Sequence, residues 1–385
     1  MTADNPRAPE DGAQPHHPHP TGTHEHGHSV YEPGEFLGAP PEEAIPDREV
    51  SLARRFLNLR TIGSIVFGVL ILVLLFQVVL KIDFGATWAQ IVTANPIYLL
   101  LATLAYYATF PLRGLRWRFV LGRVGTKIGR RDATEILFLS WFVNCLVPAK
   151  LGDLYRAYLL KGNYGGSISR TVGTIFIERI ADIVVIFALA LAAGFWSFRG
   201  RSRPEIDALF LAGFVFAAIL VLLVVALNYF GGRLTRFLPE RAADLYERFH
   251  EGSTGALTAR SLPVIGALTI VIWLFEGLRL FFVILALDLP DMNLGISASL
   301  FVALAGSLLT AIPLTPAGVG FVEAGIVGLL ALYGVVGEPA VAVALTDRAI
   351  SILTVIVLGG IFYAFSAKVR RAHAGDVAAE VGAEA

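Results

Sequence analysis

Apolar windows separated by short polar links fill most of the chain between residues 62 and 366. A helix needs about 20 predominantly apolar residues to cross the hydrocarbon core of a bilayer. Windows near that length predict membrane spans at 62–80, 96–118, 171–197, 207–229, 262–287 and 340–366. The pattern predicts an all-α polytopic membrane protein with about six full spans.

Two further apolar stretches, 133–160 and 297–334, are each broken in the middle. The first break is VPAKLGD (147–153) and the second is IPLTPAGVG (312–320). Backbone that leaves the helix at membrane depth must be buried in protein or face a water-filled cavity. Two broken helices in corresponding places are typical of transporter binding sites. We expect two re-entrant hairpins; two complete pairs of spans are the alternative, and they would leave the orientation unchanged.

The two broken stretches indicate an internal repeat. The PAKLG of the first break aligns with the PAGVG of the second, and ERIADIV (178–184) aligns with DRAISIL (347–353) at almost the same offset. Each unit, 133–197 or 297–366, is then a hairpin followed by a span that begins with an acid–arginine pair. Three predicted spans separate the hairpins, so the second hairpin enters from the opposite face. This arrangement is an inverted repeat.

Composition limits the remaining possibilities. Hydrophobic residues make up 55% of the chain, charged residues make up 16%, and the formal net charge is zero, so no global bias toward nucleic acid exists. The single cysteine excludes an internal disulfide, no Cys/His spacing in the core resembles a zinc site, and no cofactor is expected. The composition predicts a disordered His- and Pro-rich tail at residues 1–50, before the transmembrane domain (51–366), and a flexible tail at 367–385, after it. The histidines indicate either a metal-binding tail or a low-complexity segment.

Basic residues set the predicted orientation. They gather before the first span, after the second, in the longest loop and after the last span, at Arg54, Arg55, Arg60, Arg113, Arg116, Arg118, Arg123, Lys127, Arg130, Arg131, Arg233, Arg236, Arg241, Arg248, Arg260, Lys368, Arg370 and Arg371. Cytoplasmic loops carry such an excess, which predicts a multi-pass plasma-membrane protein with both termini in the cytoplasm. The loop 199–203 disagrees. The loop 231–253 predicts a helix on the cytoplasmic leaflet, or one packed on the bundle.

The hairpin breaks predict an anion site. We expect Pro148 and the pair Thr315-Pro316 to start the second half of each hairpin, because proline suits the first helical position and threonine caps it. Helix starts carry partial positive charge and free N–H groups, which hold anions. We expect Asn144, one turn before Pro148, to bond backbone freed by the break. The break residues are Asn144, Pro148, Gly152, Pro316, Gly318 and Gly320.

Three charges at three-residue spacing follow the first break. Lys150, Asp153 and Arg156 are expected on roughly one face of the half-helix. Lys150 and Arg156 suit a phosphate headgroup, and Asp153 can pair with either of them. The alternative is an ordinary interfacial helix end whose two basic side chains reach toward water.

Ionisable residues elsewhere in the core complete the set of substrate-binding candidates. Glu323 stands alone in an apolar segment, where such a residue is rare and usually functional; it would counter a cationic headgroup, carry a coupling proton, or pair with Arg179, Arg279 or Arg348. Acid–arginine groups stand at the start of the span that follows each hairpin, and residues 276–279 hold a further i,i+3 pair. For all of these groups, structural ion pairing and substrate contact remain equal alternatives. The candidates are Lys150, Asp153, Arg156, Glu178, Arg179, Glu323 and Arg348.

Over about 59–366 the chain resembles the lysylphosphatidylglycerol synthase transmembrane family of flippase-like proteins. The resemblance rests on LRGLRWRFVL, NCLVPAKLGDLYRAYLL, ERIADIV, PLTPAGVGFVEAGI and DRAISIL. The family pattern often has a glycine where this chain has Ala317. The resemblance implies a lipid-handling membrane protein. The chain stops at Ala385, which leaves no room for an aminoacyl-transferase domain, so we expect no synthesis of lysylphosphatidylglycerol by this chain itself.

Three functions follow as hypotheses. The first is a flippase or transporter for an anionic or aminoacylated phospholipid, or for a polyprenyl phosphate. The second is an intramembrane transferase or hydrolase, although no nucleotide-binding loop or nucleophile motif supports it. The third is a non-catalytic membrane partner of a lipid-modifying enzyme or glycosyltransferase.

Overall fold

The computed structural model describes residues 81–147, 150–199, 239–255, 260–288, 294–310 and 315–374, together with a few single positions and short pieces at 70, 77, 208–222 and 258. All of them belong to one compact unit, 49–385. The histidine-rich tail and Pro148 lie outside the described residues. Of the predicted spans 62–80 and 207–229, only single positions and short pieces are described.

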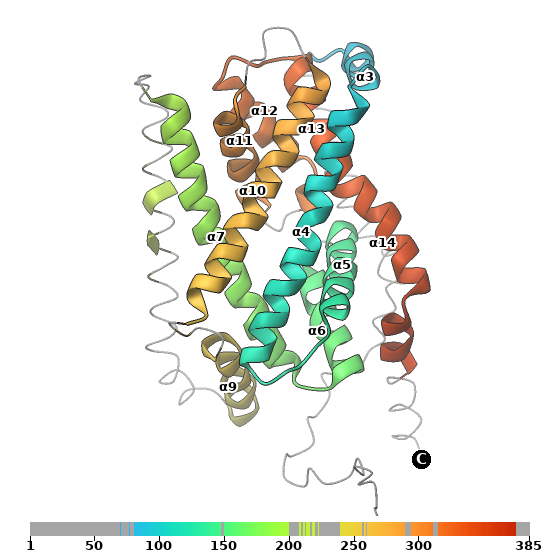
Figure 1. Cartoon of the computed structure of the whole chain (residues 1–385), viewed down its shortest axis with the longest axis vertical. Coiled ribbons are helices and arrows are strands. Elements are labelled where there is room, and N and C mark those ends of the chain that lie inside the picture. Colours follow the sequence, from blue (N-terminus) through green and yellow to red (C-terminus); the bar gives the residue numbers. More distant parts are fainter. Residues whose placement is uncertain are drawn as a thin grey trace, which may run out of the picture. The chain divides into compact units, whose positions relative to one another are not determined.

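Every regular element of the described residues is helical, as predicted (Figure 1). The helices are α3 (Phe84–Val92), α4 (Pro96–Arg123), α5 (Arg130–Leu146), α6 (Leu151–Tyr164), α7 (Ile168–Phe198), α9 (Glu240–Thr254), α10 (Leu262–Leu287), α11 (Ile296–Leu309), α12 (Phe321–Ala331), α13 (Glu338–Arg348) and α14 (Thr354–Phe365). A 3₁₀ turn, η3 (Pro316–Gly318), precedes α12, and a π-turn, η4 (Ala349–Leu353), joins α13 to α14. Residues 367–374 are also helical.

Within the described residues, α10 and the run from α13 to α14 are each long and apolar enough to cross a membrane. Helices α3 and α4, which are bent by 88° at their junction, would form a third membrane span if the pair counts as one span. Helices α4 and α7 cover two other predicted spans. The sequence pattern does not predict α3, whose start is capped by Asp83.

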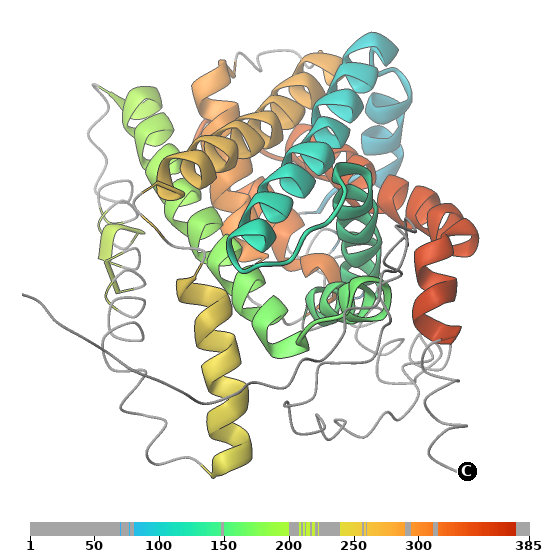
Figure 2. The ribbon, with the colours of Figure 1, turned by 60° about the horizontal axis from the view of Figure 1, so that its bottom comes forward.

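Helices α4 and α10 form the central pair and lie side by side in both views (Figures 1 and 2). Helix α7 packs against α11 along one part of its length and against α9 along another. The α7–α9 contact is close because Gly173 and Gly252 lie at it; a Cβ on either glycine would fall about 2 Å from a backbone oxygen of the other helix (2.2 and 2.0 Å). Helix α9 therefore packs on the bundle, which is the second of the two positions predicted for this loop.

One end of the helical unit, termed the basic end, gathers the last turn of α4, the starts of α5 and α7, the end of α6, and α9. Tyr164 at the end of α6 donates a hydrogen bond to Asp132 at the start of α5, and Lys368 pairs with the same carboxylate at 2.6 Å. Ser169 of α7 donates to a backbone oxygen of α9. The first hairpin, α5–α6, thus starts and ends at the basic end.

The opposite end holds the second hairpin. Phe198, the last residue of α7, stacks on Tyr333 just after α12 (4.7 Å between ring centroids) and meets Phe301 in α11 edge-on. The start of α4 bonds the end of α10 here, through Asn95 N and the Ala286 oxygen at 2.7 Å. The second hairpin, α11–α12, therefore starts and ends away from the basic end.

The breaks differ from the prediction in where the second half-helices begin. Lys150, not a proline, precedes α6 and adopts a left-handed conformation with φ 55°. Thr315 and Pro316 do not start α12, because a turn with positive φ at Ala317, Gly318 and Gly320 intervenes. Helix α12 begins at Phe321. The proline-start expectation is thus wrong for the second hairpin, since these positive φ angles are incompatible with helix.

Asn144 satisfies the first break as expected. Its Oδ1 accepts a hydrogen bond from Gly152 N at 2.9 Å. Glycine is required at 152 because a Cβ there would fall 2.1 Å from the Ser140 backbone oxygen. The close approach folds α6 back against α5.

Candidate anion-binding site

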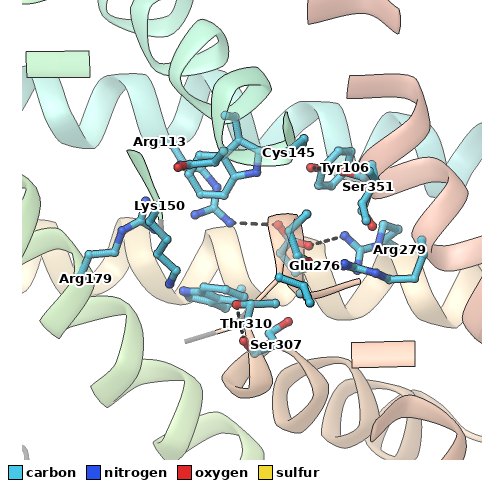
Figure 3. Close-up of a pocket in the computed structure, with 18 of the residues that line it drawn as sticks. Tyr106, Arg113, Cys145, Lys150, Arg179, Glu276, Arg279, Ser307, Thr310 and Ser351 are labelled. Carbon is cyan, nitrogen blue, oxygen red and sulfur yellow. Dashed lines mark hydrogen bonds and ion pairs between the residues drawn. The ribbon is translucent and has the colours of Figure 1, made fainter. Parts of the chain in front are cut away.

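The two hairpin breaks face each other across a cavity of about 150 Å³ (Figure 3). Helices α4 and α10, the first part of α7, and η4 complete its wall. Polar and charged side chains dominate the lining, namely Tyr106, Arg113, Trp141, Asn144, Lys150, Arg179, Trp273, Glu276, Arg279, Ser307, Thr310, Thr315, Arg348 and Ser351. Five of these carry a positive charge, and only Glu276 is a carboxylate.

A buried ion network joins α4, α10 and α13 along one side of the cavity. Glu276 accepts from Arg113 at 2.9 Å and from Arg279 at 2.6 Å. Arg279 also forms a two-bond contact with Asp347, at 2.7 and 3.0 Å. The predicted i,i+3 pair of Glu276 and Arg279 is therefore present, and it is embedded in a larger network (Figure 3).

Aromatic rings hold the Arg113 guanidinium. Its carbon lies 4.6 Å from the Trp141 ring centroid and 5.2 Å from that of Trp273. Its Nη1 is buried and has no hydrogen-bond partner among the described residues. Arg113 is thus fixed in place, with one buried donor unused.

A second network lies behind the cavity wall. Arg116 contacts Asp182 through two bonds, at 2.6 and 3.1 Å, and Glu178 at 3.2 Å. Arg156 pairs with the other oxygen of Glu178 and stacks on Trp117. Both arginines are 2% exposed. The carboxylates of α7 neutralise the charges of these two arginines, and the ion pairs link α4 and α6 to α7.

One acid–arginine pair ties each hairpin to the span that follows it. Asp153 accepts two bonds from Arg179, at 3.0 and 2.7 Å. Glu323 accepts one from Arg348 at 3.0 Å, and its second oxygen accepts from Gly320 N at 2.7 Å. Each acid is the third residue of its half-helix, α6 or α12. Both arginines line the cavity.

Lys150 contributes a charge without a partner. No ion pair or side-chain hydrogen bond involves its ammonium group among the described residues. Figure 3 shows Lys150 beside Arg179 on one side of the cavity and Arg279 on the other, with Glu276 between them.

The structure therefore divides the sequence candidates. Lys150, Arg179 and Arg348 line the cavity, whereas Arg156 and Glu178 lie behind it. Asp153 pairs with Arg179, not with the expected Lys150 or Arg156, because the fold of α6 against α7 sets the partner. Glu323 takes one of the three partners expected for it, Arg348.

The sequence pattern misses several residues of the cavity and of the network behind it. It predicts Arg113 and Arg116 as cytoplasmic boundary charges, but both are buried in the bundle. Trp141 and Trp273, which as tryptophans of a membrane protein are most simply interface or packing aromatics, line the cavity. Their position could have indicated burial, because both arginines stand inside the predicted span 96–118.

An apolar groove of about 1140 Å³ lies on the other side of α4, between α4, α5 and α14. Its lining is mostly aliphatic and aromatic, and Arg130 and Arg131 stand where it reaches the basic end. Phe110 of the groove meets Trp141 of the cavity edge-on, 6.1 Å between centroids. A layer of aromatic rings thus separates the apolar groove from the cationic cavity.

Comparison with known proteins gives related membrane proteins. The model of the family described as lysylphosphatidylglycerol synthase TM region matches residues 61–359. The UPF0104 membrane protein MJ1078 of Methanocaldococcus jannaschii is 36% identical over 222 residues, which are 58% of this chain and 93% of that protein. A UPF0104 membrane protein of Methanothermobacter thermautotrophicus is 27% identical over 290 residues, or 70% and 83% of the two chains.

A further relative is the glycosyltransferase AglD of Haloferax volcanii. It is 28% identical over 354 residues, which are 83% of this chain but 57% of AglD. The chain thus spans little more than half of that protein.

Proposed function

The chain belongs to the lysylphosphatidylglycerol synthase transmembrane-region family, and on that premise we propose that it is a transporter that moves an anionic lipid between membrane leaflets. One observation carries the proposal. A cavity lined by five cationic side chains lies where two broken hairpins meet inside the helical unit. Charged side chains at membrane depth are costly, and they are found where a protein binds or moves polar groups.

The arrangement of the hairpins supports alternating access. The first hairpin starts and ends at the basic end, and the second starts and ends at the other end. Equivalent acid–arginine pairs anchor both of them, Asp153 with Arg179 and Glu323 with Arg348. We interpret the two units as an inverted repeat whose relative movement opens the cavity to one side and then to the other.

The groove between α4, α5 and α14 supports a lipid as the substrate. The headgroup would occupy the cationic cavity while an acyl chain follows the apolar groove, which requires the contact of Phe110 and Trp141 between them to part during transport. Acyl chains that stay in an apolar environment avoid the transfer cost of about 0.8 kcal/mol per CH₂ group. The transported polar group is then the only part that needs a built site.

The orientation belongs to the same proposal. The basic end gathers the links rich in arginine and lysine, so it would face the cytoplasm. Residues 367–374 lie at this end through the Lys368–Asp132 pair, so in the proposed orientation the C-terminal side of α14 would face the cytoplasm of a plasma-membrane protein.

A second candidate follows from the similarity to AglD. The chain would then serve glycosyl-lipid chemistry, either by moving a glycosylated polyprenyl-phosphate lipid or as a non-catalytic membrane partner of a glycosyltransferase. An intramembrane transferase or hydrolase is the enzymatic alternative. The three hypotheses differ in what happens to the lipid, since an enzyme changes lipid chemistry and a transporter changes only sidedness.

Reconstitution tests the proposal. Purified protein is placed in liposomes that contain a fluorescent anionic lipid, and an impermeant reductant bleaches the outer leaflet. We expect protein-dependent loss of the inner-leaflet signal, with lipid composition unchanged by mass spectrometry. Lys150→Gln should abolish the loss, whereas Lys127→Gln, a matched change on the exposed link after α4, should not. Chemical conversion of the lipid, or no movement of any anionic lipid tested, would overturn the proposal.

A further inference from the structure

The charges of the cavity and its networks do not cancel, and the excess lies on one residue. Glu276 and Asp347 balance two arginines, Asp153, Glu178 and Asp182 balance three, and Glu323 balances one. The six balanced arginines are Arg113, Arg116, Arg156, Arg179, Arg279 and Arg348. Lys150 is the seventh cation of the cavity and its networks, and no ion pair joins it to a carboxylate among the described residues.

Lys150 is held where it faces the cavity. It is the residue before α6, adopts a left-handed conformation, and lines the cavity beside Arg179 (Figure 3). A non-glycine residue at positive φ is uncommon, and such positions often mark functional sites.

The carboxylates at the cavity are already paired with arginines. Glu276, the one carboxylate that lines the cavity, already accepts from Arg113 and Arg279. Asp153 and Glu323 each accept from an arginine and also from an amide group. A substrate ammonium group would therefore meet only carboxylates whose charge an internal arginine already neutralises.

We propose that the cavity binds the phosphodiester of an amine-free headgroup, with Lys150 as its direct donor. The inference rests on the proposed function and narrows its substrate. A phosphodiester has one ionisable oxygen and carries one negative charge, which matches the single excess cation. Desolvated charges require such matching, because an unbalanced charge in a low-dielectric site is costly.

Other headgroups match less well. A phosphate monoester carries about −1.5 to −2 charges near neutral pH, so part of its charge would be unbalanced. Zwitterionic and aminoacylated headgroups carry an ammonium group with no free carboxylate to meet it. The aminoacylated phospholipid that the family name suggests is thus excluded by this charge balance.

Equilibrium binding tests the inference without transport. Four short-chain lipids with identical tails are titrated into the detergent-solubilised protein: phosphatidylglycerol as diester, phosphatidic acid as monoester, phosphatidylcholine as zwitterion, and lysylphosphatidylglycerol as aminoacylated diester. Tryptophan fluorescence reports binding because Trp141 and Trp273 line the cavity. We expect the amine-free diester to bind at least tenfold more tightly than each of the others.

Amino-acid substitutions test the charge balance of the cavity. Lys150→Gln should weaken diester binding at least tenfold, Lys150→Arg should retain most of it, and Lys127→Gln should leave it unchanged. Asp153→Asn releases the charge of Arg179 at the cavity wall and raises the excess to two cations. It should shift preference toward the monoester. Equal or tighter binding of monoester, zwitterion or lysyl lipid by the unmodified protein, or diester binding unaffected by Lys150→Gln, would overturn the inference.

Two further measurements test whether the ligand is a lipid or a free headgroup, and whether binding at the site leads to transport. Glycerophosphoglycerol, the headgroup without acyl chains, should bind more weakly than the lipid if the groove contributes. Equal affinity for both would leave the diester site standing and count against a lipid substrate. Selective diester binding without movement in liposomes would likewise refute the transporter proposal while supporting the site.

Discussion

Replacement of Glu323 by glutamine separates a structural ion pair from a proton carrier. Glu323 is the third residue of α12 and is 3% exposed. One oxygen accepts from Arg348 at 3.0 Å, and the other accepts from Gly320 N at 2.7 Å. Glutamine keeps an oxygen for Gly320 but removes the charge that faces Arg348.

The expected cost follows from burial. Removing one partner of a buried ion pair costs about 3–5 kcal/mol. Arg348 lines the cavity and still donates to the Ala317 oxygen, so the lower value of about 3 kcal/mol applies. Glu323→Ala also loses the bond to Gly320 and should cost about 1 kcal/mol more. At about 2–4 °C per kcal/mol for a domain of this general size, Glu323→Gln should lower Tm by roughly 6–12 °C.

Thermal unfolding in detergent measures this shift. The matched control is Glu338→Gln, because Glu338 accepts a backbone hydrogen bond from Asp83 at an exposed site; its effect should stay within about 0.5 kcal/mol. The double variant Glu323→Gln/Arg348→Gln should be less destabilised than the sum of the single variants by about 2 kcal/mol. Additive single effects would show that the two side chains are not coupled.

Transport supplies the refuting result. A coupling-proton role predicts that Glu323→Gln stops lipid movement even at temperatures where the variant is fully folded. A structural ion pair instead predicts lower Tm, with transport recovered at temperatures where the variant is folded. An unchanged Tm with lost transport would refute the assignment of Glu323 as a structural partner of Arg348.

Three further changes probe the hairpins and the basic end. Gly152→Ala places a methyl group 2.1 Å from the Ser140 oxygen and should cost more than about 2 kcal/mol in unfolding free energy, whereas Gly266→Ala in α10, with open space around it, should be neutral or stabilising by up to about 1 kcal/mol. Arg279→Lys cannot reproduce the two-bond contact with Asp347 and should lower stability by about 2–3 kcal/mol, measured by the same thermal unfolding. The pKa of Asp132 lies below its ordinary value because Lys368, and then Tyr164, bond to it. Its stabilising contribution is therefore present above the unfolded pKa of about 3.9 and is lost as pH falls through the lower folded pKa. Asp132→Asn should lack this acid dependence in a Tm series between about pH 6 and pH 2.

Hydrophobic length and breaks predict the main helices of this protein well. Helix α10 coincides with the predicted window 262–287, and both broken stretches form paired half-helices around a polar break. These features follow from local sequence, because apolar length and glycine or proline positions fix where helices run and stop. Helix α3 escapes the same signal because nine residues with a polar cap are too short for it.

The site is less predictable because ion pairing depends on tertiary neighbours. Spacing correctly indicates the Glu276–Arg279 pair within one helix. It cannot place Asp153 against Arg179, since that contact requires α6 to fold onto α7. Nor can it separate Arg113, which lines the cavity, from Arg118, which lies in the same helix and bonds a loop oxygen.

The two hairpin pairs provide a final prediction, because they share a position but differ in burial. The side chains of Asp153 and Arg179 are 17% and 26% exposed, whereas those of Glu323 and Arg348 are 4% and 11% exposed. Water screens the first pair more, so Asp153→Asn should cost about 1–2 kcal/mol, less than Glu323→Gln. The comparison uses thermal unfolding of both variants in the same detergent. If Asp153→Asn is the more damaging change, burial does not set the strength of these pairs, and the first hairpin must depend on Asp153 for something other than its contact with Arg179.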